Sequence, residues 1–186
     1  MAVARESGTR LVPGPSLAWL TGRGHLEPIV QRHAPGEVID LLDDLHRMLG
    51  GNRAALAHRR SGDVRPDLVV AATGQLVEVD EVQHFTAARR QTLANYPAKF
   101  PFGFSIDDYR SLIDTWIAKA HAVFTRRWSP DFDFSGGRRA QRAYEDALKD
   151  LLAPTFTGLP VLRLPVPDRD VSVTRRLLAP PIAHAA

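Results

Sequence analysis

The chain has 186 residues, 44% of them apolar, which is enough for one packed core of ordinary domain size. It has no cysteine, and this excludes disulfides, thiolate zinc sites and cysteine nucleophiles. The net charge is +3 and the isoelectric point is about 9.7, with arginine far outnumbering lysine. Clustered arginine suits contact with nucleic-acid phosphates, although an arginine-rich chain is equally typical of a GC-rich genome.

No apolar run has the length of a signal peptide or of a membrane span. We therefore expect a soluble, cytoplasmic protein without membrane contact. Residues 1–15 are predicted as a flexible arm, 16–165 as one domain and 166–186 as a peripheral tail rich in proline.

In the first half of the chain, the pattern predicts one helix and three strands. Apolar residues recur at helical spacing over about 36–49, and Gly50-Gly51 ends this helix. Residues 53–60 are predicted as a first strand. Strands at 66–70 and 76–82 follow, separated by a turn at Gly74.

In the second half, the period changes to that of helices. A long amphipathic helix is predicted from Ile106 to Phe124 with Ser105 as its N-cap, and a second over about 138–152 with Pro154 closing it. Residues 158–164 are predicted as a fourth strand. This order of elements indicates an α/β domain.

Three acidic residues lie at the edges of the two central strands. Asp67, Glu78 and Asp80 could converge at one point where a hard divalent cation would bind. Glu78 and Asp80 are two apart on a strand and therefore point to the same side. Such carboxylates repel each other unless a cation or proton lies between them. The alternative is an exposed strand face with unpaired acids.

The block Pro66-Asp67-Leu68-Val69-Val70, with Val77 to Phe85 after the turn, resembles the PD-(D/E)XK nuclease superfamily. It is most similar to the branch written Asp…Glu-x-Asp-x-x-Gln-His, near the very-short-patch-repair and restriction-endonuclease-like proteins. Asp80 stands where the superfamily usually has lysine. The resemblance implies a restriction-endonuclease-like core, with a central mixed sheet of about four strands flanked by helices, and Mg²⁺ or Mn²⁺ as cofactor.

The resemblance also implies roles for single residues. Asp67 and Glu78 would bind the metal, Asp80 would help to bind or position it, and Gln83 with His84 would orient the attacking water. A glutamine supplies no positive charge, and His84 could offset that loss as a general acid or phosphate contact. A histidine at a strand end that bonds to the backbone is the alternative for His84.

Glu37, in the first turn of the 36–49 helix, could add an acid to the metal site, as in nucleases of this type. Alternatively, it complements the helix dipole. The residues that could hold nucleic-acid phosphates are Arg59, Arg60, Arg89, Arg90, Arg138, Arg139 and Arg142.

Two of these assignments have explicit alternatives. Arg138 and Arg142 share a helix face, and a solvated face with Glu145 and Lys149 as an i,i+4 pair explains them as well. The phenylalanines of the 131–137 loop could stack on bases or pack over the core.

The leading hypothesis is a metal-dependent nuclease that hydrolyses phosphodiester bonds, in DNA rather than RNA, in a restriction, repair or defence setting. The alternative is a nuclease-fold module that binds nucleic acid or a protein partner without cleavage. Whether the chain forms a homodimer is left open by the sequence.

Overall fold

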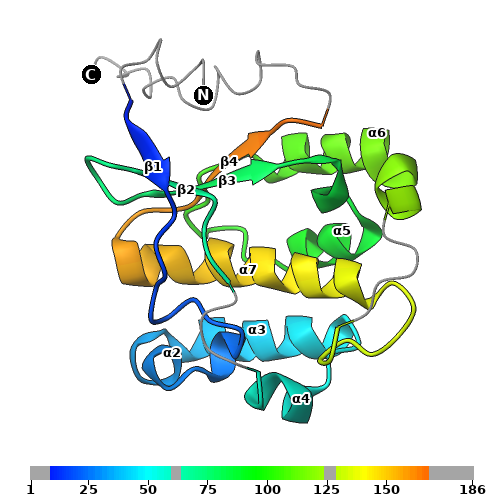
Figure 1. Ribbon diagram of the computed structural model, residues 1–186, viewed down its shortest axis with the longest axis horizontal. Coiled ribbons are helices and arrows are strands. Elements are labelled where there is room, and N and C mark those ends of the chain that lie inside the picture. Colours follow the sequence, from blue (N-terminus) through cyan, green and yellow to red (C-terminus); the bar gives the residue numbers. More distant parts are fainter. Residues whose placement is uncertain (1–8, 60–63, 124–128, 168–186) are drawn as a thin grey trace.

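A computed structural model describes residues 9–59, 64–123 and 129–167. The chain is α/β, with one mixed sheet covered by helices (Figure 1). No helix in the described ranges is long and apolar enough to cross a membrane.

The sheet has four strands in the order β1-β2-β3-β4. Strands β1, β2 and β3 are antiparallel neighbours, and β4 lies parallel to β3. Gly74 makes the turn between β2 and β3 with a φ of 72°, in the left-handed region that favours glycine. The strands are Leu11–Pro13 (β1), Leu68–Val70 (β2), Leu76–Asp80 (β3) and Leu162–Pro165 (β4).

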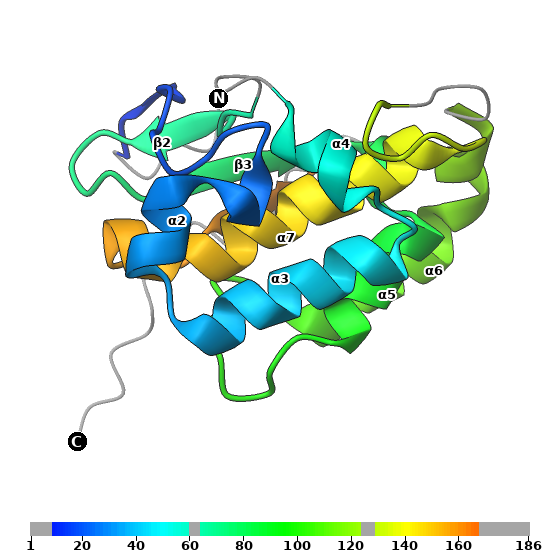
Figure 2. The ribbon, with the colours of Figure 1, turned by 90° about the horizontal axis from the view of Figure 1, so that it is seen from below.

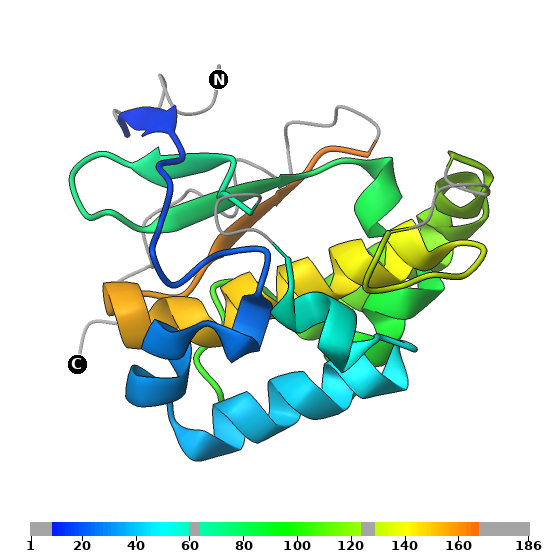
Figure 3. The ribbon, with the colours of Figure 1, turned by 60° about the horizontal axis from the view of Figure 1, so that its bottom comes forward.

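Helix α7, Gly137–Thr157, is the central element of the helical part. It runs beneath the sheet, and α3 lies on its other side (Figures 1 and 3). Helices α3 and α5 both pack against α7, as the view from below shows (Figure 2). The other helices are α2 (Pro28–His33), α3 (Gly36–Met48), α4 (Arg53–Ala57), α5 (Ala87–Ala94) and α6 (Ile106–Val123), with short 3₁₀ turns η1 (Gly24–Leu26) and η2 (Val82–His84).

Most of the predicted elements are present. Helices α3 and α6, strands β2 and β3 and the final strand β4 lie where the pattern predicted them, and Ser105 Oγ accepts a hydrogen bond of 3.2 Å from the Asp108 N–H as the cap of α6. The predicted mixed sheet of four strands flanked by helices is confirmed at this level.

Three predictions on secondary structure were wrong. Residues 53–57 form helix α4, because Asn52 caps it and Leu56 is the residue it buries. Helix α7 continues through Pro154 to Thr157 and ends at Gly158, whose φ is 74°. Residues 11–13, predicted within the flexible arm, form the edge strand β1.

His46 is buried in the core between α3 and α7. Its ring packs edge-on against Phe132 and Tyr144, with centroids 5.0 and 4.9 Å away, and is 1% exposed. The pKa of His46 is lowered to about 4, mainly because the ring is buried and secondly because His25 lies nearby. The folded state therefore holds a neutral imidazole where the unfolded chain would bind a proton.

This burial predicts acid sensitivity. The contribution of His46 to the free energy of unfolding is fully present above pH 6.5. It is lost as the pH falls toward 4, for a total of about 3 kcal/mol. We expect His46→Leu to flatten the fall in unfolding free energy between pH 6.5 and 4, measured by urea denaturation. His33→Leu, at an exposed histidine of α2, is the control. An equal slope in the wild type and in His46→Leu would contradict the assignment.

Candidate functional site

The antiparallel pairing of β2 and β3 brings Asp67 next to Glu78. The Asp67 carboxylate accepts a hydrogen bond from the Val79 N–H at 2.8 Å, and the Asp67 N–H donates to Glu78 Oε1 at 3.3 Å. Asp67 is exposed, whereas Glu78 is 1% exposed. The structure thus places these two predicted ligands side by side, one facing solvent and one beneath it.

Lys149 of α7 forms an ion pair with Glu78, and both side chains are buried. Burial raises the pKa of Glu78 to about 7, against the opposing effects of Lys149 and Arg163. Burial also acts to lower the pKa of Lys149, but Glu78 and Asp146 outweigh it, so the net shift is upward and the ammonium is retained. A lysine 71 residues away in the sequence therefore supplies positive charge at Glu78.

The alternative i,i+4 pair of Glu145 with Lys149 was wrong. Glu145 instead meets Arg59 at 3.4 Å and Arg138 at 3.9 Å. Helical spacing placed Lys149 near Glu145, but the packing of α7 under β3 turns the lysine toward the sheet.

Asp80 points to the same side as Glu78 but has different partners. Both of its oxygens accept from Arg163 Nη1, at 2.8 and 3.0 Å, and Oδ2 also accepts from the Tyr109 hydroxyl at 2.9 Å. Its side chain is fully buried. Asp80 is therefore part of an internal ion-pair network, and its predicted part in binding metal stays a prediction.

Arg163 of β4 is the centre of that network. Besides Asp80, its guanidinium meets Asp146 at 3.4 Å and Asp150 at 2.9 Å, both on α7. Asp150 also accepts from Arg89 Nη2 at 2.6 Å and from the Tyr96 hydroxyl at 2.7 Å. Arg163, Asp146 and Asp150 are not among the site residues predicted from the sequence. Their only signal was acidic and basic residues inside segments otherwise rich in apolar residues.

His84 bridges this network and the surface. Its Nδ1 lies 3.0 Å from Asp146 Oδ2 and 3.3 Å from Asp80 Oδ1, and its Nε2 lies 2.9 Å from Arg142 Nη1. Burial tends to raise the pKa of Asp146, but His84 and Arg163 hold it well below its usual range. Asp146 thus stays an anion beside the imidazole.

Among the described residues, one group of side chains could hold a metal ion: Asp80, His84 and Asp146. Their ligand atoms all lie within 4.8 Å of one another. The neighbouring groups favour a proton there. A guanidinium only donates, so Arg142 requires a lone pair on Nε2, and the ring proton then lies on Nδ1 between the carboxylates. A metal ion bound to Nδ1 would require that proton to move to Nε2. The Nε2–H would then face the N–H donor of Arg142, which is unfavourable.

Two other predicted site residues lie elsewhere. Gln83 is half-buried and donates to the Glu81 carboxylate beside it, rather than to Asp67 or Glu78. Glu37 is exposed on α3, which α7 separates from the sheet (Figures 1 and 3), so it does not join Asp67 and Glu78.

The predicted arginines have different environments. The prediction that Arg89 contacts a phosphate was wrong, because its side chain is fully buried and forms an ion pair with Asp150. Arg59 pairs with Asp131 at 3.1 Å, and Arg90 pairs with Asp114. Arg60 lies outside the described residues. The other three are on the first half of α7, where Arg142 contacts His84 at 2.9 Å, Arg138 pairs with Glu145 and Arg139 donates to the His121 carbonyl.

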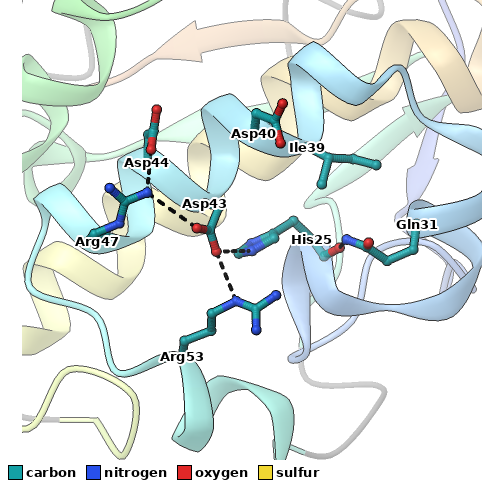
Figure 4. Close-up of a pocket in the computed structure, with 8 residues that line it drawn as sticks. All are labelled: His25, Gln31, Ile39, Asp40, Asp43, Asp44, Arg47 and Arg53. Carbon is teal, nitrogen blue, oxygen red and sulfur yellow. Dashed lines mark hydrogen bonds and ion pairs between the residues drawn. The ribbon is translucent and has the colours of Figure 1, made fainter.

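A hollow of about 450 Å³ lies on the opposite side of α7, between η1, α3 and α4 (Figure 4). Its central carboxylate, Asp43, is already paired with His25 at 3.0 Å, Arg53 at 3.1 Å and Arg47 at 3.4 Å. His25 Nδ1 in turn lies 2.6 Å from the buried Tyr144 hydroxyl. These mutual pairs give the hollow a structural role in joining η1, α3 and α7.

Comparison with known proteins gave no matching family model, curated protein or solved structure. The site therefore has to be interpreted from its own geometry.

The Arg163 network should dominate stability. Replacing Arg163 with Met removes the partner of three buried carboxylates, and we expect a loss of about 3–5 kcal/mol in unfolding free energy, measured by urea denaturation. Arg110→Gln is the control. This partly exposed arginine pairs with Asp107 on the same helix, a contact worth under about 1 kcal/mol, and donates to the Leu93 carbonyl at 3.3 Å. Similar losses in both variants would contradict the central role of Arg163.

Proposed function

We propose that this protein is a metal-dependent phosphodiesterase of the nuclease type, with Asp67, Glu78 and Lys149 at its site. The observation that carries the proposal is the position of Lys149, whose ammonium meets Glu78 where Glu78 adjoins the exposed Asp67. Two carboxylates and a lysine are the groups that the resemblance requires, and α7 supplies the lysine that the strand lacks. Magnesium and manganese prefer such carboxylate oxygens.

Each residue has a distinct part in this reaction. Asp67 and Glu78 would hold the cation, which supplies charge stabilisation at the phosphate when bound. Lys149 adds fixed positive charge beside the reacting phosphate. His84 is oriented through Nδ1 by Asp146 and Asp80, and its Nε2 would act as a general base once Arg142 turns from Nε2 to the substrate phosphate.

The alternative is a module that binds nucleic acid or a protein without cleavage. One observation favours it: Glu78 is 1% exposed and already neutralised by Lys149, so this pair is satisfied without a cation. The two functions differ in whether metal binds at Asp67 and Glu78, and in whether Lys149 is needed for turnover.

Metal binding can be measured without a substrate. We expect Mn²⁺ to raise the melting temperature of the wild type, because a ligand of the folded state stabilises it by about 2.7 kcal/mol at 100 times its Kd. Asp67→Asn and Glu78→Gln should abolish the rise, while Asp107→Asn, at an exposed acid of α6, should keep it. The same Mn²⁺ shift in Glu78→Gln and the wild type would remove Glu78 from the site.

Cleavage tests the role of Lys149. With Mg²⁺ or Mn²⁺, we expect the wild type to cut DNA, and Lys149→Met to lower the rate about 100-fold or more, as removal of one charge-stabilising group does in other enzymes. Lys99→Met, at an exposed lysine before α6, is the matched control. The panel should include RNA, and highly purified protein is needed because contaminating nucleases mimic low activity. Equal rates in both lysine variants would exclude Lys149, and no metal-dependent cleavage at all would favour the binding module.

A further inference from the structure

Two large hydrophobic side chains are exposed among the described residues, Met48 at 43% and Phe134 at 42%. Both line one hollow of about 200 Å³ between the end of α3, the start of α5 and the loop before α7. Gln91 and Arg139 add polar groups to its wall. Exposed apolar side chains that gather around a hollow are typical of a binding surface.

The charge beside Phe134 is positive. Arg139 donates to the backbone carbonyl of His121 at 3.1 Å, and no carboxylate of the described residues pairs with it. Burial and then Arg139 lower the pKa of His121, which also lines the hollow. Asp133 is exposed next to Phe134 in sequence but does not line the hollow. The surface is therefore complementary to an anion that carries an apolar or aromatic group.

The hollow adjoins the proposed catalytic residues. Arg139 and Arg142 are three residues apart on α7 and are therefore neighbours on its surface. Arg142 contacts His84 at 2.9 Å, and Ala87, which lines the hollow, follows His84 by three residues. Arg139 at the hollow thus has Arg142 as its neighbour on α7, and Arg142 contacts His84 of the proposed site.

We propose that the hollow binds an unpaired nucleotide of the nucleic-acid substrate, with its base stacked on Phe134 and its phosphate held by Arg139 and Arg142. This inference rests on the proposed function and specifies its substrate. Stacking on an aromatic ring next to arginine is how proteins hold single strands with little sequence preference. The Gln91 amide offers a donor and an acceptor to the base edge.

The size of the hollow supports one base rather than a duplex. Its volume of about 200 Å³ is below the range of about 300–1,000 Å³ typical of pockets for drug-sized ligands. The preferred substrate is then a single strand, or a duplex with an unpaired end, and an intact blunt duplex binds more weakly.

Binding in EDTA, where no cleavage occurs, tests this. Fluorescence anisotropy with a labelled single-stranded oligonucleotide should show about fivefold to 150-fold weaker binding for Phe134→Ala. Phe134→Trp, which keeps a stacking ring, should bind as the wild type does. Arg139→Gln should weaken binding and reduce its salt dependence, whereas the matched control Arg110→Gln should not. Melting temperatures of all variants check that each is folded.

The outcomes separate this inference from the proposed function. Phe134-dependent binding without metal-dependent cleavage supports the nucleotide site and overturns the nuclease. Cleavage with equal affinity in the wild type and Phe134→Ala overturns the nucleotide site and leaves the nuclease standing. A wild type that binds no oligonucleotide, or that self-associates through Phe134 in sedimentation experiments, also overturns the nucleotide site.

Discussion

The arrangement of the sheet and the helices depends on the ion pairs of one fully buried guanidinium, that of Arg163. It lies on β4 and meets Asp80 of β3 together with Asp146 and Asp150 of α7. A buried charge without its partner costs several kcal/mol, so these elements have to meet in one register. Phe104 and Tyr109 lie over the same guanidinium and exclude water from it. The position of α7 under the sheet follows from this network.

The fixed position of α7 in turn assembles the candidate site. Lys149 and Arg142 are seven residues apart, about 10 Å along the helix, and they meet Glu78 and His84 respectively. Catalytic groups that project from rigid elements need little reorganisation during a reaction. The network that stabilises the fold therefore also sets the distance between the carboxylates and the imidazole of the candidate site.

Helix α7 is buried on two sides with different chemistry. The side toward the sheet carries charged groups, whereas the side toward α3 packs Tyr144 against His25, His46 and Phe132. In a helix covered on both sides, the polar face is buried as well as the apolar one, although its charged residues keep the spacing of a solvated face. This explains why Asp146 and Lys149 resemble solvated residues in the sequence although both are buried.

Local patterns were sufficient for α3, α6 and the β2–β3 hairpin, because periodicity and turn residues act over a few neighbours. They also indicated that Asp67 and Glu78 would lie together, since a short hairpin fixes its own pairing. Local patterns failed to predict α4, where an N-cap and one buried leucine determine that the segment is a helix. They also failed to predict the burial of Arg89, which depends on Asp150, 61 residues away. The sequence by itself thus determined α3, α6, most of α7, and the hairpin with its two acids. Only the tertiary structure decided that Lys149 meets Glu78, because a pairing across 71 residues depends on how α7 packs and leaves no periodic signal.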